Sequence, residues 1–206
     1  MAAAQKQRRG AATRADIINV ARQLFSEHGY HATGLADIQS ATGLTKGAFY
    51  HHFRSKEELG LAVLEAAQAD YATYLLEPVA KVRQPGERLR AMLDGVLGLN
   101  ARPEWRNCLM VATLCAELTA GDPRLQDSVR IMQERMFGLW RKLIVEAQKS
   151  RDVDPALDPD VWAQWIINTL VGTLLTRKAG SAQVEPARLI TAIKESLLGA
   201  TTHPAV

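Results

Sequence analysis

The sequence predicts an all-α fold. β-branched and polar residues do not alternate for long in any segment, although a half-buried strand requires such alternation. Apolar residues recur instead at the three- and four-residue spacing of helices, and Pro and Gly interrupt the chain between these segments. With 206 residues and 47% hydrophobic content, the chain can bury a core in one domain or in two small ones.

Three short helices are predicted at the N-terminal end. The first lies between a cap at Thr13 and a stop at Gly29, and its apolar positions form one face: Ile17, Ala21, Leu24 and Phe25. The second spans Leu35–Thr42, and a tight turn follows at Gly43. Thr45 then caps the third helix.

The rest of the chain is predicted to form longer helices. Ser55 and Glu58 have the spacing of a capping box, which opens a helix that reaches Pro78. Pro and Gly clusters separate the remaining helical segments, which we place near 86–101, 106–120, 123–150, 158–179 and 185–199.

Residues 35–53 have the dimensions of a helix-turn-helix motif, in which the second helix enters the major groove of DNA. In this second helix Phe49 and Phe53 share one face and are expected to be buried. The opposite face is rich in donors, and its residues are expected to contact bases and phosphates: Thr45, Lys46, Gly47, Tyr50 and His51. A merely structural place for Tyr50, at the edge of the core, stays open.

Two further residues are candidates for phosphate contacts. Thr33 is expected to cap the second helix, where its hydroxyl and the helix N-terminal amides suit a phosphate. Lys56, at the start of the fourth helix, can bind a phosphate by its charge. His51 and His52 point about 100° apart on a helix and cannot share one ion, so no metal site is expected.

Positive charge is concentrated near the N-terminus. Residues 1–56 hold eight Lys and Arg against three Asp and Glu, a net charge of +5, and the other 150 residues hold 17 against 19, a net charge of −2. This asymmetry is typical of a nucleic-acid-binding module. A solvated basic arm that aids solubility is the alternative.

Residues 13–60 resemble the TetR family of bacterial transcriptional regulators. The resemblance rests on Thr33, Ile38, Gly43 and two runs, Lys46-Gly47-Ala48-Phe49-Tyr50-His51-His52-Phe53 and Ser55-Lys56-Glu57-Glu58-Leu59. The first run is also similar to the subgroup of N-ethylmaleimide-responsive and acrylate-responsive repressors. The resemblance implies nine or ten helices, with a helix-turn-helix head and a helical body that binds a ligand and forms an Ω-shaped homodimer.

The residues of the last two helices agree with a homodimer. The segment 158–179 is apolar nearly all round, so one of its faces needs a partner besides its own core. Gly172 permits close approach of another helix. A helix buried wholly inside one subunit is the alternative.

The body is expected to hold an apolar ligand cavity lined by soft and aromatic side chains around a few polar groups. Cys108 opens a helix beside Arg102 and Arg106, and this setting lowers a thiol pKa and raises its reactivity. The resemblance implies a sensing cysteine in a similar place, although Asn107 stands where glycine is expected. The candidate ligand-binding residues are Cys108, Met110, Met136, Trp140, Trp165 and Asn168.

These observations predict a transcriptional regulator, most simply a repressor, that binds a palindromic DNA operator as a homodimer and is released by a small apolar or electrophilic effector. The DNA-binding domain is placed at 1–56, with a flexible arm to about residue 12, and the ligand-binding and dimerisation domain at 57–206. Neither catalysis nor a cofactor is expected, since no convergent set of titratable residues is visible. Polar, basic residues at the N-terminus and two unpaired cysteines predict a cytoplasmic protein with no membrane partner. An activator of the same family and an architectural DNA-binding protein without a ligand are the alternatives.

Overall fold

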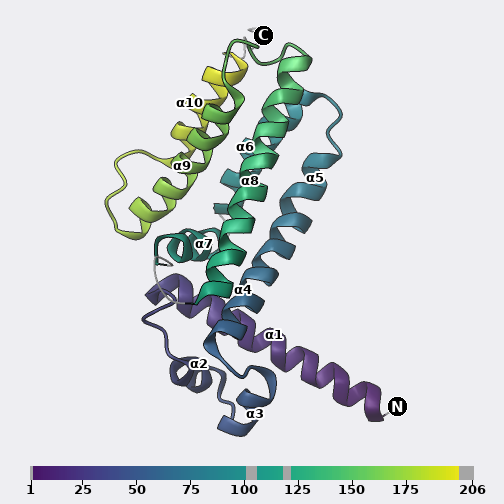
Figure 1. Cartoon of the computed structure of the whole chain (residues 1–206), viewed down its shortest axis with the longest axis vertical. Coiled ribbons are helices and arrows are strands. Elements are labelled where there is room, and N and C mark those ends of the chain that lie inside the picture. The colour runs from purple at the N-terminus through teal and green to yellow at the C-terminus, as the bar shows by residue number, and fades with distance from the viewer. Residues whose placement is uncertain (1, 101–105, 118–121, 200–206) are drawn as a thin grey trace, which may run out of the picture. The chain divides into compact units, whose positions relative to one another are not determined.

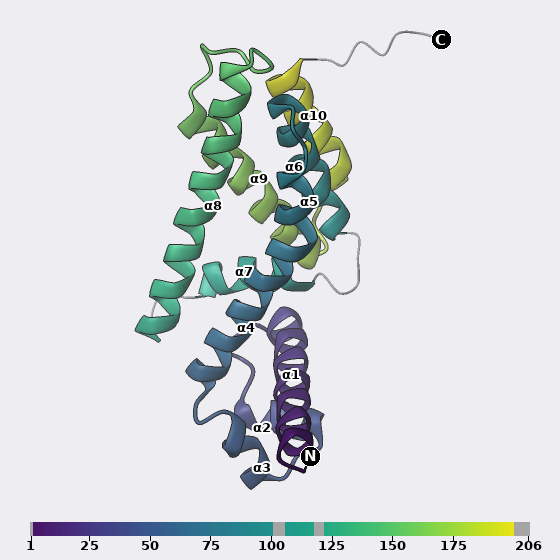
Figure 2. The same cartoon turned by 90° about the vertical axis from the view of Figure 1, so that its right-hand side faces the viewer.

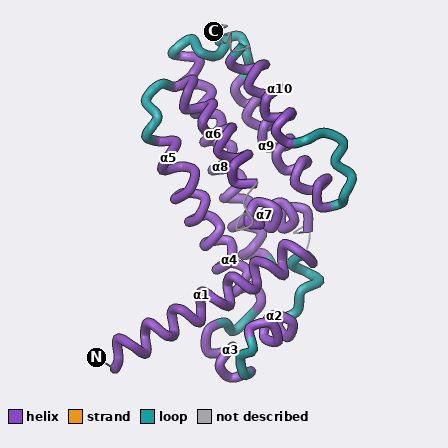
Figure 3. The backbone as a smooth tube through the Cα atoms, turned by 180° about the vertical axis from the view of Figure 1, so that it is seen from behind, coloured by secondary structure: helices purple, strands orange, loops and turns teal. Residues whose placement is uncertain are grey.

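The computed structural model describes residues 2–100, 106–117 and 122–199, and every regular element in these ranges is a helix (Figure 3). The all-α prediction is confirmed. The chain packs into two compact units. The first consists of residues 1–69 and 106–130, and the second of residues 70–105 and 131–206.

The first three helices of the first unit are α1 (Ala2–His28), α2 (Leu35–Thr42) and α3 (Lys46–His52) (Figure 1). The bounds of α2 and the stop after α1 agree with the prediction: Gly29 has φ +92°, and its N–H donates to Phe25 O at 3.0 Å. The predicted start of α1 at Thr13 is wrong. Helical backbone begins at Ala2, because the added segment consists almost wholly of Ala, Gln, Lys and Arg, which are strong helix formers.

The core of the first unit is formed by apolar side chains from α1, α2, α3 and α4 (Lys56–Tyr71). On α1 the predicted face is buried at Ile17, Ala21 and Phe25, and Leu24 is half-buried. The other helices contribute side chains that are no more than 1% exposed: Ile38, Phe49, Phe53, Leu59, Val63 and Leu64.

Helix α4 continues without a break into a π-helical turn, η1 (Ala72–Leu76), and then into α5 (Glu77–Ala80). The predicted end at Pro78 agrees with this continuous stretch to within two residues, since its last residue is Ala80. Proline lacks an N–H and its ring presses on the carbonyl four residues earlier, so a regular helix does not continue through it. The wider turn, in which the Glu77 N–H donates to Ala72 O, precedes Pro78 and carries the helix past it. With α4, η1 and α5 counted as one, the described part of the chain has nine helices.

Helix α7 (Arg106–Glu117) and the start of α8 (Pro123–Lys149) complete the first unit. Helix α7 packs against α1. At its end the Glu117 carboxylate accepts a hydrogen bond from the His31 N–H at 3.0 Å. A Cβ atom on Gly29 would overlap Glu117 Oε1, so only a glycine at position 29 leaves room for this carboxylate. The end of α7 therefore holds the turn between α1 and α2.

The second unit contains α6 (Pro85–Asn100), most of α8, α9 (Pro159–Lys178) and α10 (Pro186–Leu198). Their bounds agree with the predicted segments to within a residue or two. Asp158 caps α9 by accepting from the N–H groups of Asp160 and Val161. Helix α10 lies beside α6 (Figure 2), where Lys194 pairs with Asp94. The core residues of this unit include Leu89, Met92, Leu93, Trp140, Ile144, Ile166, Ile190 and Ile193.

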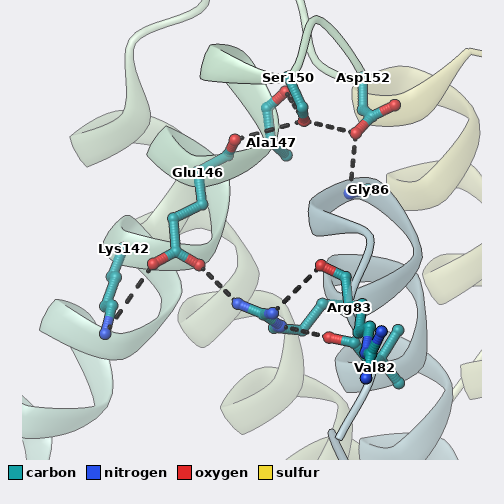
Figure 4. A network of polar contacts seen from close by, with 9 residues as sticks. Val82, Arg83, Gly86, Lys142, Glu146, Ala147, Ser150 and Asp152 are labelled. Atoms are coloured by element: carbon teal, nitrogen blue, oxygen red, sulfur yellow. Dashed lines mark hydrogen bonds and ion pairs between the residues drawn. The ribbon is translucent and has the colours of Figure 1, made fainter. Parts of the chain in front are cut away.

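A polar network ties the loop before α6 to the end of α8 (Figure 4). Arg88 donates to Val82 O at 2.8 Å and to Glu146 Oε2 at 2.9 Å. Asp152, just beyond α8, accepts from the Gly86 N–H at 2.9 Å and from the Ser150 hydroxyl. These bonds satisfy backbone groups at a loop and at a helix end, where regular structure leaves them without partners.

The predicted boundary between a DNA-binding domain at 1–56 and a ligand-binding and dimerisation domain at 57–206 stays a prediction. By packing, the first unit extends to residue 69 and takes in 106–130.

Among the residues described, no helix combines the length and the apolar character needed to cross a bilayer.

Candidate nucleic-acid interface

Helix α3 is anchored by its back and capped at its start. Phe49 and the following Phe53 are both 0% exposed, as predicted. The Thr45 hydroxyl oxygen accepts from the Ala48 N–H at 3.3 Å, which confirms Thr45 as the cap. Its hydroxyl proton stays available to a phosphate or a base. The guanidinium of Arg14, from α1, lies 4.9 Å from the centre of the Phe53 ring.

The front of α3 is open to solvent. Lys46, Gly47 and His51 are exposed, and Tyr50 is 40% exposed although its ring packs edge-on against Phe49. A Cβ atom on Gly47 would meet nothing within 4 Å in the protein, so the free space at this position lies on the outer side. The structure thus brings Thr45, Lys46, Gly47, Tyr50 and His51 together on one accessible face.

The turn between α2 and α3 has a support that sequence reasoning missed. Gly43 takes the left-handed conformation, with φ +66°, and its N–H donates to Ser40 O at 3.2 Å. The Gln39 amide donates to Leu44 O at 3.3 Å. The sequence does not indicate this contact, because Gln39 reaches Leu44 O only after the turn at Gly43 has brought the two groups together.

The predicted capping role of Thr33 is wrong. Gly34 is the N-cap of α2, and its N–H donates to the Asp37 carboxylate at 2.7 Å. Thr33 is 2% exposed, and its hydroxyl lies 2.7 Å from Gly29 O, to which it donates. Asp37, at the third position of α2, supplies the side chain that caps this helix. The Thr33 hydroxyl instead binds a backbone carbonyl of the turn between α1 and α2.

Lys56 is half-buried at the edge of the first unit. Its ammonium donates to His31 O at 3.1 Å and lies 4.5 Å from the centre of the Tyr30 ring. Burial lowers the pKa of Lys56, and the carboxylates of Asp122, Glu117 and Asp37 act against this shift. An ammonium has three protons, so these contacts fix the side chain and leave it able to donate outward.

The residues predicted to line a ligand cavity are dispersed. On α8, Trp140 is 0% exposed, and the half-buried Met136 accepts a hydrogen bond from the Tyr71 hydroxyl at 3.4 Å. On α9, Trp165 is 44% exposed and Asn168 is exposed, with its side chain accepting from the Gln164 amide at 2.8 Å. Both side chains face solvent in the single chain, and their place in a ligand cavity stays a prediction. Cys108 and Met110 belong to α7, but their side chains lie outside the described residues.

Within the described ranges no three His, Cys, Asp or Glu side chains gather as they would around a metal ion. The rings of His51 and His52 lie 5.3 Å apart with their planes at 71°. Their position on α3 suits hydrogen bonds to separate groups.

Two family models match the chain. The model for bacterial regulatory proteins of the tetR family covers residues 17–63, and the model for a tetracyclin repressor-like C-terminal domain covers residues 85–193. The first match spans α2, α3 and the first half of α4, together with the buried part of α1. The second spans α6 to α9 and most of α10.

The HTH-type transcriptional repressor DhaR of Mycobacterium sp. is 27% identical over 92% of this chain and 94% of its own length. The transcriptional regulator AcuR of Cereibacter sphaeroides is 30% identical over 73% of this chain and 70% of its own. A solved TetR regulator from Chloroflexus aurantiacus has 27% identity and a TM-score of 0.79, covering 91% of this chain and 94% of that one.

Two other solved structures share the fold at lower identity. NemR of E. coli, in its reduced form, has a TM-score of 0.77 at 20% identity and covers 93% of this chain and 100% of that one. AibR, solved with isovaleryl coenzyme A and operator DNA, has a TM-score of 0.73 at 19% identity and covers 91% and 98%. The helix-turn-helix geometry and the two matching models lead to one conclusion: the chain belongs to the TetR family of bacterial regulatory proteins, DNA-binding proteins that regulate transcription.

Proposed function

We propose that this protein is a ligand-responsive repressor that binds a palindromic operator as a homodimer and leaves it when a small apolar or electrophilic effector binds. One observation carries the proposal. Helix α3 buries Phe49 behind it and presents Lys46, Tyr50 and His51 to solvent, which is the arrangement a helix needs to enter the major groove.

Each residue on this face has a defined part in the proposed complex. Lys46 donates to a guanine or to a phosphate, and the bare backbone at Gly47 lets α3 approach the base edges. The Thr45 hydroxyl, Tyr50 and His51 donate to phosphates beside it. Lys56 adds a further positive charge at the edge of the head. Few of these groups read bases, so DNA shape contributes much of the specificity.

The exposed face of α9 supports the homodimer. Val161 is 63% exposed and Trp165 is 44% exposed, although both are large apolar residues on a helix with a buried face at Ala163 and Ile166. A second copy of α9 would remove these side chains from water. Dimerisation also places two heads at half-sites about one helical turn of DNA apart, which accounts for a palindromic operator.

The effector is inferred from the body and from the relatives. Trp140 and Met136 supply an apolar and polarizable environment in α8, and Cys108 supplies a thiol at the start of α7. AibR was solved with an acyl coenzyme A and operator DNA together. Release from DNA needs an effector that favours a second conformation by a few kcal/mol. Such a regulator acts where the chromosome lies, in the cytoplasm.

The test begins with duplexes that the wild-type protein selects from a random library. Lys46→Ala should weaken binding to a selected duplex and reduce the slope of log K against log salt by about one unit per half-site, because one cation fewer then faces the DNA there. Lys149→Ala removes another exposed lysine, at the end of α8, and should leave affinity and slope unchanged.

Equal affinity and slope for the wild type and Lys46→Ala would remove Lys46 from the interface. Effector release is measured on the same duplex with N-ethylmaleimide and with isovaleryl coenzyme A. Failure of both compounds to shift binding would count against the proposed effector classes and leave the DNA-binding half of the proposal standing.

A further inference from the structure

The N-terminal half of α1 extends beyond the part that the family model matches. That model begins at Ile17, whereas α1 begins at Ala2. At about 1.5 Å per residue the added segment, residues 2–16, is roughly 20 Å long. In Figures 1 and 3 it projects past α3 and α4 with no other helix of the first unit beside it. We call this segment the α1 extension.

The α1 extension is strongly basic. It carries four of the chain's basic residues, and its first acidic residue, Asp16, stands at its end. The basic residues are Lys6, Arg8, Arg9 and Arg14. The side chains of Ala11, Ala12, Arg14 and Ala15 are exposed. A core cannot account for this helix, since it has almost no apolar side chain larger than alanine.

The α1 extension starts beside the DNA-reading helix. Arg14 lies over the ring of Phe53, the residue that ends α3, at 4.9 Å from its centre. The part of α1 that precedes Arg14 therefore begins next to the C-terminal end of α3. Lys6, Arg8 and Arg9 follow along the same helix toward its N-terminus, so the part of α1 that runs on past α3 carries three more basic residues.

We propose that the α1 extension is a second DNA-contacting surface, which binds phosphates flanking the half-site that α3 reads. This inference rests on the proposed function. Charge complementarity selects the partner, because a helix with four cations and one terminal acid fits the phosphate backbone. A segment of roughly 20 Å covers about six base pairs at 3.4 Å each. Its contacts add affinity and lengthen the site without reading further bases.

The decisive variant removes two charges from the α1 extension, Arg8→Ala with Arg9→Ala, in the full-length protein. Binding to the selected duplex should fall about tenfold or more near 0.1 M salt, and the slope of log K against log salt should fall by about one unit for each phosphate that loses its cation in a half-site. Binding to a scrambled duplex should weaken in parallel, since phosphates carry no sequence. Hydroxyl-radical footprints should lose protection at the outer flanks and keep it at the centre.

Two controls match the variant. Lys81→Ala with Arg83→Ala removes two exposed charges from the second unit, and should leave affinity and slope as in the wild type. Arg8→Lys with Arg9→Lys keeps both charges and should restore binding. If Arg8→Ala with Arg9→Ala behaves like the control at 81 and 83, the inference is wrong. If the wild type selects no duplex at all, the proposed function fails first, so the two failures are distinct.

Discussion

Tyr30 links three parts of the first unit at a single side chain. Its ring packs edge-on against Phe25 of α1 with centroids 5.2 Å apart, and its hydroxyl donates to the Asp122 carboxylate at the start of α8. The ammonium of Lys56 lies over the same ring. Burial, the largest cause, raises the pKa of Tyr30 well above its usual range, and the bond to Asp122 and the charges of Asp122 and Glu57 act in the same direction.

Tyr30→Phe should lower the free energy of unfolding by about 1–2 kcal/mol at neutral pH, because a hydrogen bond to a charged acceptor is removed. The raised pKa fixes the pH dependence. The folded state holds the phenolic proton more tightly, so the stabilisation is complete below the unfolded pKa of about 10 and is lost as pH rises beyond it. Urea unfolding at pH 7 and pH 11 should therefore show the difference between wild type and variant shrinking at high pH.

Tyr50→Phe is the control for this comparison, since Tyr50 is 40% exposed. A difference between wild type and Tyr30→Phe that stays constant from pH 7 to pH 11 would contradict the assignment. The role of Tyr30 was beyond sequence reasoning. Asp122 lies 92 residues further along the chain, and nothing in the local pattern around Tyr30 indicates which distant group accepts its proton.

At the scale of elements, local chemistry made most of the helices predictable. The glycines at 29 and 43 and the cap at Thr45 act within a few residues, so their consequences appear in the sequence. The same holds for Ser55, whose hydroxyl accepts from the Glu58 N–H at 3.0 Å. The π-helical turn η1 was missed because it depends on what packs beside it.

Leu75 in η1 packs against α6 at Gly95, where α6 has no side chain. It is 2% exposed, and a Cβ atom on Gly95 would overlap its Cδ1. The wide turn and the glycine thus belong to one contact between two helices. This explains why hydrophobic periodicity, which treats each helix alone, found α6 but gave no role to its glycine.

Gly95→Ala should lower the free energy of unfolding by about 1–2 kcal/mol, because the new methyl group displaces a buried leucine side chain. Gly98→Ala, one turn further along α6, meets nothing within 4 Å and should raise stability by about 0.5–1 kcal/mol through helix propensity alone. Thermal unfolding of both variants measures the contrast. If both variants shifted the unfolding temperature by the same amount in the same direction, Leu75 would move aside at no cost in folding free energy.

At the scale of the whole molecule, charge and apolar exposure divide between the two units. The basic excess lies in residues 1–56, and large exposed apolar side chains of α9 lie in the second unit. The charged residues of the sequence indicated the basic excess, and the helical periodicity indicated the exposed apolar face of α9. The place of Trp165 and Asn168 in a cavity stays a prediction, because a helix that is apolar nearly all round does not reveal which side meets its own core.

Trp165→Glu should convert a dimer into a monomer, since it places a charge on the face of α9 that we expect a second copy to cover. Operator affinity should fall with it, because two linked heads bind far more tightly than two free ones. Sedimentation velocity measures the mass. Ile131→Glu, at a 38% exposed apolar site on α8, should remain dimeric. A dimeric Trp165→Glu protein would show that α9 pairs elsewhere.

The first unit is assembled from two stretches of chain, and this has a consequence for its synthesis. Residues 1–69 reach the outside of the ribosome well before residues 106–130, yet His31 and Tyr30 bind partners at Glu117 and Asp122. Domains otherwise tend to fold in the order in which they are made. In the growing chain, the packing of residues 1–69 therefore stays incomplete until Glu117 and Asp122 have also left the ribosome.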